Sequence, residues 1–314
     1  MALSAGASIL RRRFIVDTDV GFDDIVALRA LLLHFSGKIQ HEDVLLSAVH
    51  GISEPSVGAY NLKRCFSQIT VVESSLNVPQ AHAEVPSWLK DYRSDLQTLQ
   101  NTFAKTTSNP SPTEKSFEPV YEFLQNTSDD ACVVVLCLGP LSNLAAWYKQ
   151  HGPLLEEKVH EIWILGGNDP RSTDPTPEFN LSQDAAASHY IFSSALALKV
   201  RLVLASDTSP DKLGYVVDQI RDFVVDKRGM LARLLQIRPH ECCFDPLAAY
   251  AMSQAAAVAA NYEKVPMSVN PSTGLLSFGN GKLVYLVQDL SVTTGFLPWL
   301  QKAIELDSHN AIEL

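Results

Sequence analysis

A short stretch near the N-terminus places four carboxylates within eight positions. It runs FIVDTDVGFDD from Phe14 to Asp24, and its acids are Asp17, Asp19, Asp23 and Asp24. Like charges this close repel one another and raise each other's pKa. Hard divalent cations bind several oxygen ligands, so crowded carboxylates become favourable once a cation neutralises them. A water held by such a cation becomes a nucleophile when a carboxylate accepts its proton, so the stretch favours hydrolytic chemistry.

These acids fall at the junction of a predicted strand and a predicted helix. The strand is RFIVDTD (13–19), and the helix is DDIVALRALLLHF (23–35). Asp23 and Asp24 would lie in the first helical turn and complement the helix dipole, which explains two of the acids structurally. The other two acids have no such explanation. We therefore interpret the cluster as a functional site.

Strand-like and helix-like segments keep alternating beyond this junction. Further strands are predicted at 44–50, 131–139, 160–167 and 199–205, and further helices at 55–69, 141–151 and 183–194. Continuous apolar strands between helices are typical of a mainly parallel sheet covered on both faces, so we predict a Rossmann-like α/β fold. Ligands bind such sheets beyond the carboxyl ends of the strands. Residues 206–262 are predicted to form a helical cap, and residues 104–116 a mobile loop.

Composition excludes several classes of function. The chain has 314 residues, of which 46% are apolar, and a formal net charge of −10. That acidity argues against binding nucleic acid or an anionic membrane, and no apolar run reaches the roughly 18 residues of a membrane helix. Residues 1–13 are predicted to be a flexible tail, because their arginines follow the apolar stretch, the reverse of a secretory signal. The five cysteines show no zinc spacing, which favours reduced thiols in a cytoplasmic protein.

Five segments along the chain carry a family resemblance. VDTDVGFDDIVAL resembles the Asp-rich N-terminal signature of the inosine-uridine-preferring nucleoside hydrolases. Four later segments resemble the family in the same order: LGPLSNLA (138–145), ILGG (164–167), PEFN (177–180, with Asp184 after it) and FDPLAAY (244–250). The resemblance implies a Rossmann-like single domain over 14–314 that hydrolyses ribonucleosides to ribose and free base. It also implies a bound calcium ion and a homo-oligomer.

The resemblance assigns the metal-binding residues by position. Asp19, Asp24 and Asp245 would bind calcium through their side chains, and Leu138 through its carbonyl oxygen. Asp19 would also be the general base that takes a proton from the calcium-bound water. Asp17 would support this shell by hydrogen bonding. A site dense in carboxylates suits the reaction, because positive charge grows on the sugar in the oxocarbenium-like transition state.

The resemblance also assigns the ribose-binding residues. Asp23 would hold the 2′-hydroxyl, and Glu178 and Asn180 would hold the outer hydroxyls. Asn168, just after the ILGG segment, is assigned to substrate binding as well. The family usually has an Asn or Asp after the second strand, where this chain has Ile52 followed by a serine. That serine, Ser53, is predicted to replace the lost ribose contact, with Glu54 as the alternative.

The base-binding side departs further from the family. Non-specific members have a histidine before the last metal aspartate that helps to protonate the leaving base, and this chain has Phe244. An aromatic residue there resembles the purine-specific branch, in which it stacks on the base, so purine nucleosides are slightly favoured. A plain pocket wall is the alternative role.

Trp88 and Tyr92 lie on a possible lid helix, for which ordinary helix packing is the favoured interpretation. His82 and His240 are interpreted as surface residues, although His240 could approach a base.

Two rival interpretations stay open at this stage. FIVDTDV also resembles the opening of haloacid-dehalogenase-like phosphatases, in which Asp17 would be the nucleophile and Asp19 the acid/base, with magnesium. Asp207 and Asp211 would supply the final motif of that family, but the later segments would have no explanation. Alternatively, the missing Asn and His would mark a degenerate relative that binds calcium or ribosides without turnover. The favoured prediction is a cytoplasmic, calcium-dependent nucleoside hydrolase of purine salvage.

Overall fold

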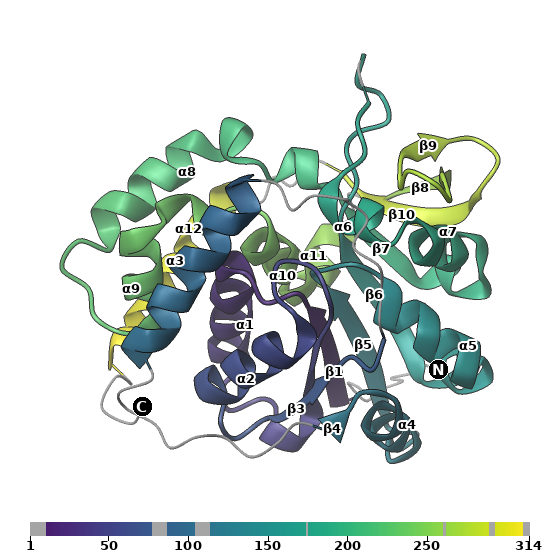
Figure 1. The fold of residues 1–314 in the computed structure, drawn as a ribbon, viewed down its shortest axis with the longest axis horizontal. Coiled ribbons are helices and arrows are strands. Elements are labelled where there is room, and N and C mark those ends of the chain that lie inside the picture. The colour runs from purple at the N-terminus through teal and green to yellow at the C-terminus, as the bar shows by residue number, and fades with distance from the viewer. Residues whose placement is uncertain are drawn as a thin grey trace, which may run out of the picture.

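A ten-stranded sheet forms the centre of the molecule in the computed structural model, which describes residues 11–76, 87–103, 114–173, 175–259, 262–288 and 293–309. The strand order is β4-β3-β2-β1-β5-β6-β7-β10-β8-β9 (Figure 1). The pairings from β4 to β10 are parallel, and β8 pairs antiparallel with β10 and β9. The predicted Rossmann-like, mainly parallel α/β fold is therefore confirmed. The strands are β1 (Arg11–Thr18), β2 (Val44–Ala48), β3 (Thr70–Glu73), β4 (Glu114–Lys115), β5 (Ala131–Cys137), β6 (Val159–Leu165), β7 (Val200–Val203), β8 (Tyr262–Val269), β9 (Leu276–Phe278) and β10 (Lys282–Val287).

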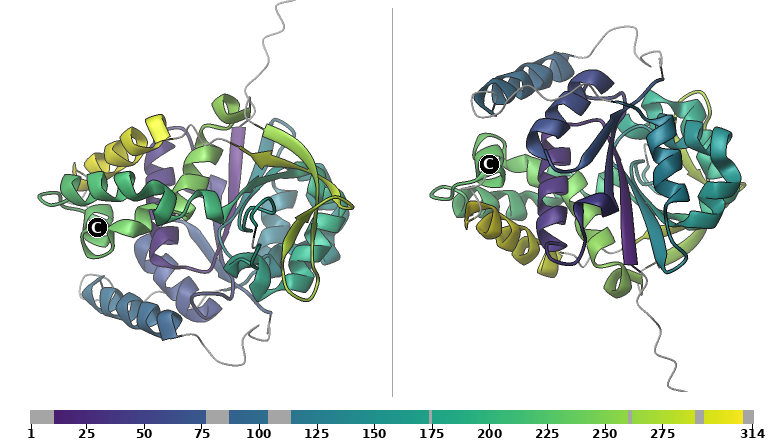
Figure 2. Two further views of the ribbon diagram at one scale, coloured as in Figure 1. Left: turned by 90° about the horizontal axis from the view of Figure 1, so that it is seen from above. Right: turned by 90° about the horizontal axis from the view of Figure 1, so that it is seen from below.

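Helices cover both faces of this sheet. Figure 2 shows purple and green helices on one side of the strands and teal helices on the other. The helices are α1 (Phe22–His34), α2 (Pro55–Cys65), α3 (Ser87–Phe103), α4 (Phe117–Gln125), α5 (Ser142–Lys158), α6 (Phe179–Gln183), α7 (Ala185–Ser193), α8 (Pro210–Phe223), α9 (Met230–Ile237), α10 (Asp245–Ser253), α11 (Ala255–Val258) and α12 (Thr293–His309). Short 3₁₀ turns are η1 (His41–Asp43), η3 (Ala195–Lys199), η4 (Ala205–Asp207) and η5 (Pro239–Cys242).

The predicted elements are present, with several changes at their ends. The predicted helix 141–151 continues to Lys158 as α5, with a kink at His151 ahead of Pro153. The helix predicted over 183–194 is preceded by a separate short helix, α6, and Asp184 lies between the two. Sequence analysis missed β3 and the β8–β10 hairpin region. Residues 206–262 are rich in helix as predicted. Most of the predicted loop 104–116, and His82, lie outside the described residues.

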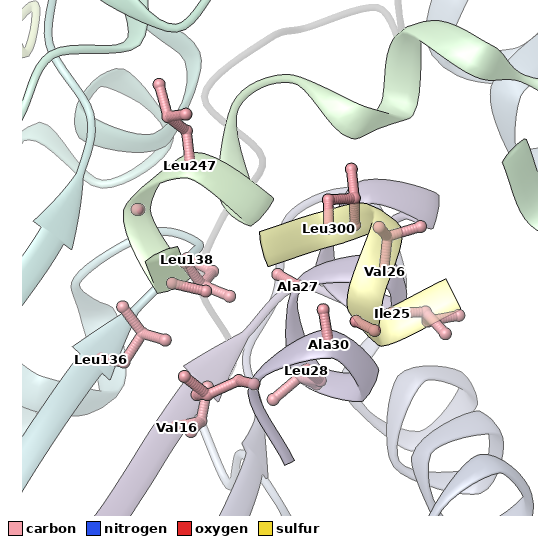
Figure 3. Close-up of a cluster of buried hydrophobic side chains, with 14 of the residues drawn as sticks. Val16, Ile25, Val26, Ala27, Leu28, Ala30, Leu136, Leu138, Leu247 and Leu300 are labelled. Carbon is pink, nitrogen blue, oxygen red and sulfur yellow. The ribbon is translucent and has the colours of Figure 1, made fainter. Parts of the chain in front are cut away.

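The two faces of the sheet bury separate apolar clusters. Successive residues of a strand point to opposite faces, so Val16 of β1 joins one cluster and Ile15 joins the other. Figure 3 shows the first cluster, in which Leu28 of α1, Leu247 of α10 and Leu300 of α12 lie near the strands β1 and β5. Each fully buried leucine contributes roughly 1.5–3 kcal/mol relative to an exposed one. This packing fixes α1 and α10 against the same face of the sheet.

Register brings the ends of the central strands level. Asp17 of β1 pairs with Ser47 of β2 on one side and with Cys137 of β5 on the other. The backbone continues this alignment, because the Leu138 N–H donates to the Asp17 carbonyl oxygen at 2.8 Å. The residues that follow β1, β2 and β5 therefore lie at one edge of the sheet. No helix in the part of the chain that the structure describes is long and apolar enough to span a membrane.

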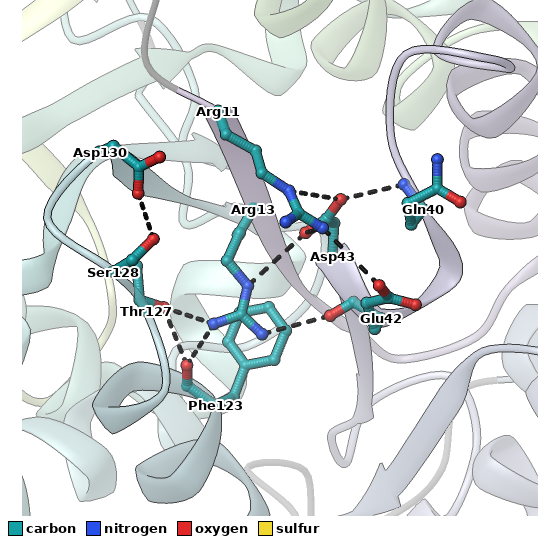
Figure 4. Close-up of polar contacts among 9 residues, drawn as sticks. All are labelled: Arg11, Arg13, Gln40, Glu42, Asp43, Phe123, Thr127, Ser128 and Asp130. Atoms are coloured by element: carbon teal, nitrogen blue, oxygen red, sulfur yellow. Dashed lines mark hydrogen bonds and ion pairs between the residues drawn. The ribbon is translucent and has the colours of Figure 1, made fainter.

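The other end of β1 begins at Arg11, so Arg11–Arg13 belong to the sheet and not to the predicted tail 1–13. Figure 4 shows how Arg13 is held. Its guanidinium donates to the Phe123 carbonyl oxygen at 2.7 Å and to Thr127 Oγ1 at 2.6 Å, and it lies 3.8 Å from the centroid of the Phe123 ring. Arg11 pairs with the buried Asp43 at 2.7 Å. Both arginines therefore tie the start of β1 to neighbouring elements.

We expect Arg13→Ala to lower the free energy of unfolding by about 2 kcal/mol, because buried acceptors on α4 lose a charged donor. Denaturant unfolding at fixed metal concentration measures this. Arg221→Ala is the matched control: its ion pair with Asp218 is exposed, and we expect a loss below about 0.5 kcal/mol. Equal small losses of stability in both variants would instead support the prediction that Arg13 belongs to the flexible tail.

Candidate active site

The turn between β1 and α1 has a strained backbone. Val20 has a φ of 62°, in the left-handed region that a β-branched residue rarely adopts. Its N–H donates to Thr18 Oγ1 at 3.0 Å, and its carbonyl oxygen accepts from Ser53 Oγ at 3.3 Å. Val20 is fully buried. These contacts hold a sharp turn directly after Asp19, so that the next acids in the chain lie beside it.

Asp24 is fixed inside this turn by two donors. The N–H of Gly21, the residue before α1, donates to Asp24 Oδ2 at 2.7 Å. The Thr18 hydroxyl donates to the other oxygen of the same carboxylate. A Cβ on Gly21 would lie 2.8 Å from an oxygen of Asp23 and 3.0 Å from one of Asp24. Glycine is therefore required for the two acids of the first helical turn to close over the loop.

Three carboxylates converge at this point. Asp23, Asp24 and Asp245 each offer one oxygen, and these oxygens lie within 4.8 Å of one another. Asp245 is the first residue of α10, and the preceding Phe244 has a φ of 57°. Asp24 and Asp245 are two of the metal ligands that the sequence predicts, and Asp23, for which the sequence predicts a ribose contact, lies beside them. We call Asp19, Asp23, Asp24 and Asp245 the acid cluster.

Asp19 lies at the edge of this cluster. Its Oδ2 accepts the N–H of Ile52 at 2.9 Å, and its backbone carbonyl oxygen accepts the N–H of Ser53 at 3.0 Å. A Cβ on Gly51 would lie 2.2 Å from Asp19 Oδ2, so only glycine fits beneath the carboxylate. Asp24 is close enough to raise the pKa of Asp19. The loop after β2 therefore fixes the orientation of Asp19.

Burial raises the pKa of every carboxylate in the acid cluster, and it is the largest cause in each case. For Asp19 and Asp245 the charge of Asp24 raises the pKa further, and for Asp23 the charge of Glu241 does so. The charged neighbours of these acids are thus other acids. Oxygen ligands that are buried, convergent and mutually repelling suit a divalent cation, so the residues present fit a metal ion.

Asp17 lies beneath the cluster and faces away from it. Its Oδ1 accepts from Asn143 Nδ2 at 2.9 Å, and burial raises its pKa to about 7. The same Asn143 amide also donates to Ser47 Oγ at 3.2 Å. This bridge joins the ends of β1, β2 and the start of α5. The side chain of Asp17 is therefore held by Asn143, and its supporting role toward the acid cluster stays a prediction.

The predicted ribose ligands Glu178 and Asn180 lie at the start of α6. Glu178 caps that helix: its carboxylate accepts the N–H groups of Asn180 at 2.8 Å, Leu181 at 3.1 Å and Gly167 at 2.9 Å. Asn180 Nδ2 donates to the carbonyl oxygens of Leu138 at 3.2 Å and Leu165 at 3.3 Å. Both amide hydrogens are thus used at the ends of β5 and β6. The Asn180 oxygen is left as an acceptor, which suits a hydroxyl donor.

The remaining predicted residues lie around these groups. Asn168 is part-exposed and donates to Thr176 across its loop at 3.1 Å. Ser53 is buried, and its hydroxyl donates to the Val20 carbonyl oxygen. Phe244 is half-buried and packs against the first apolar cluster. Asp207, which the phosphatase interpretation needs, forms an ion pair with Lys212 outside the acid cluster. All five cysteines are buried and free, as predicted.

Helix α3 covers the site, which was the less favoured of the two interpretations that the sequence left open for Trp88 and Tyr92, and it adds Arg93, which sequence analysis did not name. Tyr92 donates toward Asp23 at 3.3 Å, and Arg93 donates to the Gly51 carbonyl oxygen at 3.0 Å. Trp88 packs edge-on against Phe179, with ring centroids 5.5 Å apart. The amphipathic pattern identified the helix, but no local signal links it to loops so far away in sequence.

The turn η5 adds Glu241, which sequence analysis missed, next to His240, which it interpreted as a surface residue that could approach a base. Glu241 is buried, and its Oε1 accepts from Arg238 at 3.1 Å. His240 is about half-exposed, and its Nε2 lies 3.2 Å from the same Glu241 oxygen. In this structure, the ring of His240 therefore contacts an acid beside the site.

Comparisons with solved structures agree on this fold. The inosine-uridine preferring nucleoside hydrolase from Bacillus anthracis superposes with a TM-score of 0.71 at 18% identity. The Inosine-Guanosine Nucleoside Hydrolase superposes with a TM-score of 0.70 at 16% identity. Each match covers 94% of this chain and 99% of the other. At such identities the likeness shows the fold alone.

Sequence comparisons identify the family. The pyrimidine-specific ribonucleoside hydrolase RihA of Shewanella sp. (strain MR-7) is 26% identical over 197 residues, which cover 60% of this chain. The chain spans 58% of the length of that relative. Residues 14–292, most of the chain, match the family described as inosine-uridine preferring nucleoside hydrolase. Together with the fold, this match shows that the protein belongs to the inosine-uridine preferring nucleoside hydrolase family, and it removes the support for the phosphatase interpretation.

Proposed function

We propose that this protein is a calcium-dependent hydrolase that splits the N-glycosidic bond of ribonucleosides into ribose and free base. The observation that carries the proposal is the convergence of Asp23, Asp24 and Asp245 within 4.8 Å, at the carboxyl edge of a parallel sheet. Family membership supplies the reaction class. The acid cluster supplies the negative charge that an oxocarbenium-like transition state requires.

The proposed metal ligands are Asp19, Asp24 and Asp245, with the Leu138 carbonyl oxygen as a fourth. Calcium accepts more oxygen ligands than magnesium does and commonly takes backbone carbonyls. The Leu138 carbonyl accepts one hydrogen bond from Asn180, and a carbonyl oxygen has a second lone pair. Asp23 lies within reach of the same point and is a further candidate. When bound, the ion would lower the pKa of a coordinated water.

Asp19 is the proposed general base. The Ile52 N–H holds one of its oxygens, so the carboxylate has a fixed direction. Gly51 leaves the space that this orientation needs. A base must lie within hydrogen-bond reach of the water it deprotonates, and a carboxylate with a fixed direction beside the proposed metal ligands supports that role. Asp17 is proposed as a supporting residue, because its bond to Asn143 fixes the end of β1 two positions before Asp19.

Ribose would be bound between the acid cluster and α6. Asp23 would accept from the 2′-hydroxyl, and the free oxygen of Asn180 would accept from an outer hydroxyl. Glu178 would act beside Asn180, since it already fixes that residue through its backbone N–H. Ser53 and Asn168 are proposed to line the same pocket. Such contacts orient the sugar so that its anomeric carbon faces the attacking water.

The base-binding side is less typical of the family, and purine ribosides remain slightly favoured. Phe244 is half-buried directly before Asp245, where an aromatic ring can stack on a base. The relatives bear names of both kinds, one pyrimidine-specific and one for inosine and guanosine. A single domain over 14–314, a homo-oligomer, a cytoplasmic location and a place in purine salvage also remain proposals.

The primary test measures free ribose released from inosine, guanosine, adenosine, uridine and cytidine, with and without a calcium chelator. We expect release that the chelator abolishes and that added calcium restores, because the buried acids need a cation to act together. Release that survives the chelator would contradict the metal requirement.

Asp19→Asn is the control for this assay, since it keeps the shape of the side chain and removes its basicity. We expect its turnover to fall roughly 100-fold or more. If the unmodified protein bound a nucleoside but released no ribose, the result would instead favour the interpretation that it is a degenerate relative without turnover.

Phe244→Ala should reduce kcat/KM for inosine more than for uridine, by roughly fivefold in relative terms, because a purine offers the larger stacking surface. Steady-state kinetics with both substrates checks this. Phe278→Ala is a control, because Phe278 is a part-exposed aromatic residue on β9 that lies outside the proposed site. Equal losses for the two nucleosides would leave Phe244 as a plain wall of the pocket.

Thermal stability without metal should fall as the pH rises. A carboxyl whose pKa is raised on folding stabilises the protein fully below its ordinary pKa, and that stability is lost as the pH passes the folded pKa, about 7 for Asp17. We expect the Tm of chelated protein to drop by roughly 5 °C between pH 5 and pH 8. Calcium should raise the Tm more at pH 8 than at pH 5, because it binds ionised carboxylates. A Tm that rises with pH in chelator would contradict this.

A further inference from the structure

The hydroxyl of Tyr92 lies where α3 meets the start of α1 and the turn η5. It accepts the Phe22 N–H at 2.7 Å. It also lies 3.3 Å from Asp23 Oδ1 and 3.4 Å from Glu241 Oε2. One side chain from the covering helix thus touches an acid of the cluster, the backbone beside that acid, and a second buried acid.

The hydrogen-bond donors around Asp23 and Glu241 show which of these two acids depends on the Tyr92 hydroxyl. A tyrosine has one hydroxyl hydrogen, and two carboxylates share it here. Burial, with Asp23 and Glu241 adding to it, raises the pKa of Tyr92, so the hydrogen stays in place. Glu241 has other donors, because its second oxygen accepts from Arg238 at 3.1 Å and lies 3.2 Å from His240 Nε2. The Asp23 carboxylate accepts backbone N–H groups of its own helical turn but faces the repulsion of Glu241 and of Asp24, and the Tyr92 hydroxyl is the side-chain donor to its Oδ1.

The position of Tyr92 is itself fixed. Its ring packs edge-on against Phe22, with centroids 5.3 Å apart. The Arg238 guanidinium lies 4.7 Å from the Tyr92 ring centroid and 5.2 Å from that of Phe22. Arg238 also pairs with Asp95, one turn further along α3, at 2.8 Å. A hydroxyl held this way can hold its partner in one rotamer, which a freely rotating side chain cannot do.

We propose that Tyr92 is a positioning residue for Asp23, and that its hydroxyl aims the Asp23 carboxylate at the 2′-hydroxyl of the substrate ribose. This inference rests on the proposed function and deepens it, because it places a substrate-orienting group on the covering helix. Tyr92 touches no reacting atom in this account. It acts on the sugar through Asp23.

The test compares Tyr92→Phe with the unmodified protein, using the nucleoside that the latter hydrolyses fastest. Losing a hydrogen bond to a charged group should raise KM roughly tenfold. We expect kcat to stay within about twofold, since the sugar contact is made in the ground state and in the transition state alike. The calcium concentration for half-maximal rate should not change. Tyr148→Phe is the matched control: it removes a tyrosine–carboxylate hydrogen bond, to Glu156 on α5, and should change neither constant.

A purely structural role for Tyr92 gives a different result. It would lower the amount of folded enzyme, so apparent kcat would fall while KM stayed constant, and that outcome would overturn the proposal. An unchanged KM overturns it too. In an Asp23→Asn background, adding Tyr92→Phe should have no further effect on KM, because the group through which it acts is gone. A full tenfold effect in that background would also count against the proposal.

The proposed function can fail separately from this inference. If the unmodified protein releases no ribose from any nucleoside, the proposed function fails. The positioning role is then tested by the dissociation constant for inosine, measured by calorimetry at saturating calcium. Weaker binding of inosine to Tyr92→Phe, by roughly tenfold, would support the role. Equal binding by the two proteins, or no binding to either, would overturn it.

Discussion

Like charges buried together are the constraint on which the rest of the site depends. Asp19, Asp23, Asp24 and Asp245 are all brought to one edge of the sheet, and their charged neighbours are further acids. Three of these acids are nonetheless held by neutral donors: a backbone N–H for Asp19, a backbone N–H and a hydroxyl for Asp24, and a hydroxyl for Asp23. Neutral donors orient the carboxylates without cancelling their charge. The negative charge that the proposed cation and the proposed oxocarbenium-like transition state require is therefore kept.

Strained backbone accompanies this arrangement at two places. Val20 and Phe244 are the non-glycine residues with positive φ in the described part of the chain, and each is adjacent to an acid of the cluster. Such conformations cost of order 1–3 kcal/mol each and persist where surrounding contacts enforce them. The contacts are visible here: Thr18 and Ser53 hold Val20, and the Thr208 carbonyl oxygen accepts the Phe244 N–H at 3.1 Å. The packing of the two apolar clusters thus offsets the cost of the strained backbone, which brings acids of α1 and α10 to a common point.

Sequence patterns predicted what is local and missed what is distant. The strand and helix around 14–24 have strong patterns, so the fold class and the position of the first acids followed directly. Strand β3 has only four residues, and β8 contains Pro266, which argues against a strand, so both give weak signals. The link between Tyr92 and Glu241 joins residues 149 positions apart, and no local pattern can encode it. The family resemblance supplied Asp245, but the convergence of Asp23 with it required coordinates.

Helix α3 explains why these distant contacts matter together. Its residues contact four separate segments: the loop after β2 through Arg93, the start of α1 through Tyr92, the start of α6 through Trp88, and Arg238, the residue before η5, through Asp95. Three of these segments hold an acid of the cluster or a proposed ribose ligand, or orient one directly. A shift of α3 would therefore move donors on both sides of the pocket at once, since its contacts share one rigid helix. It follows that the position of α3 and the geometry of the acid cluster are linked, because the helix that covers the site also contacts the segments that hold these acids.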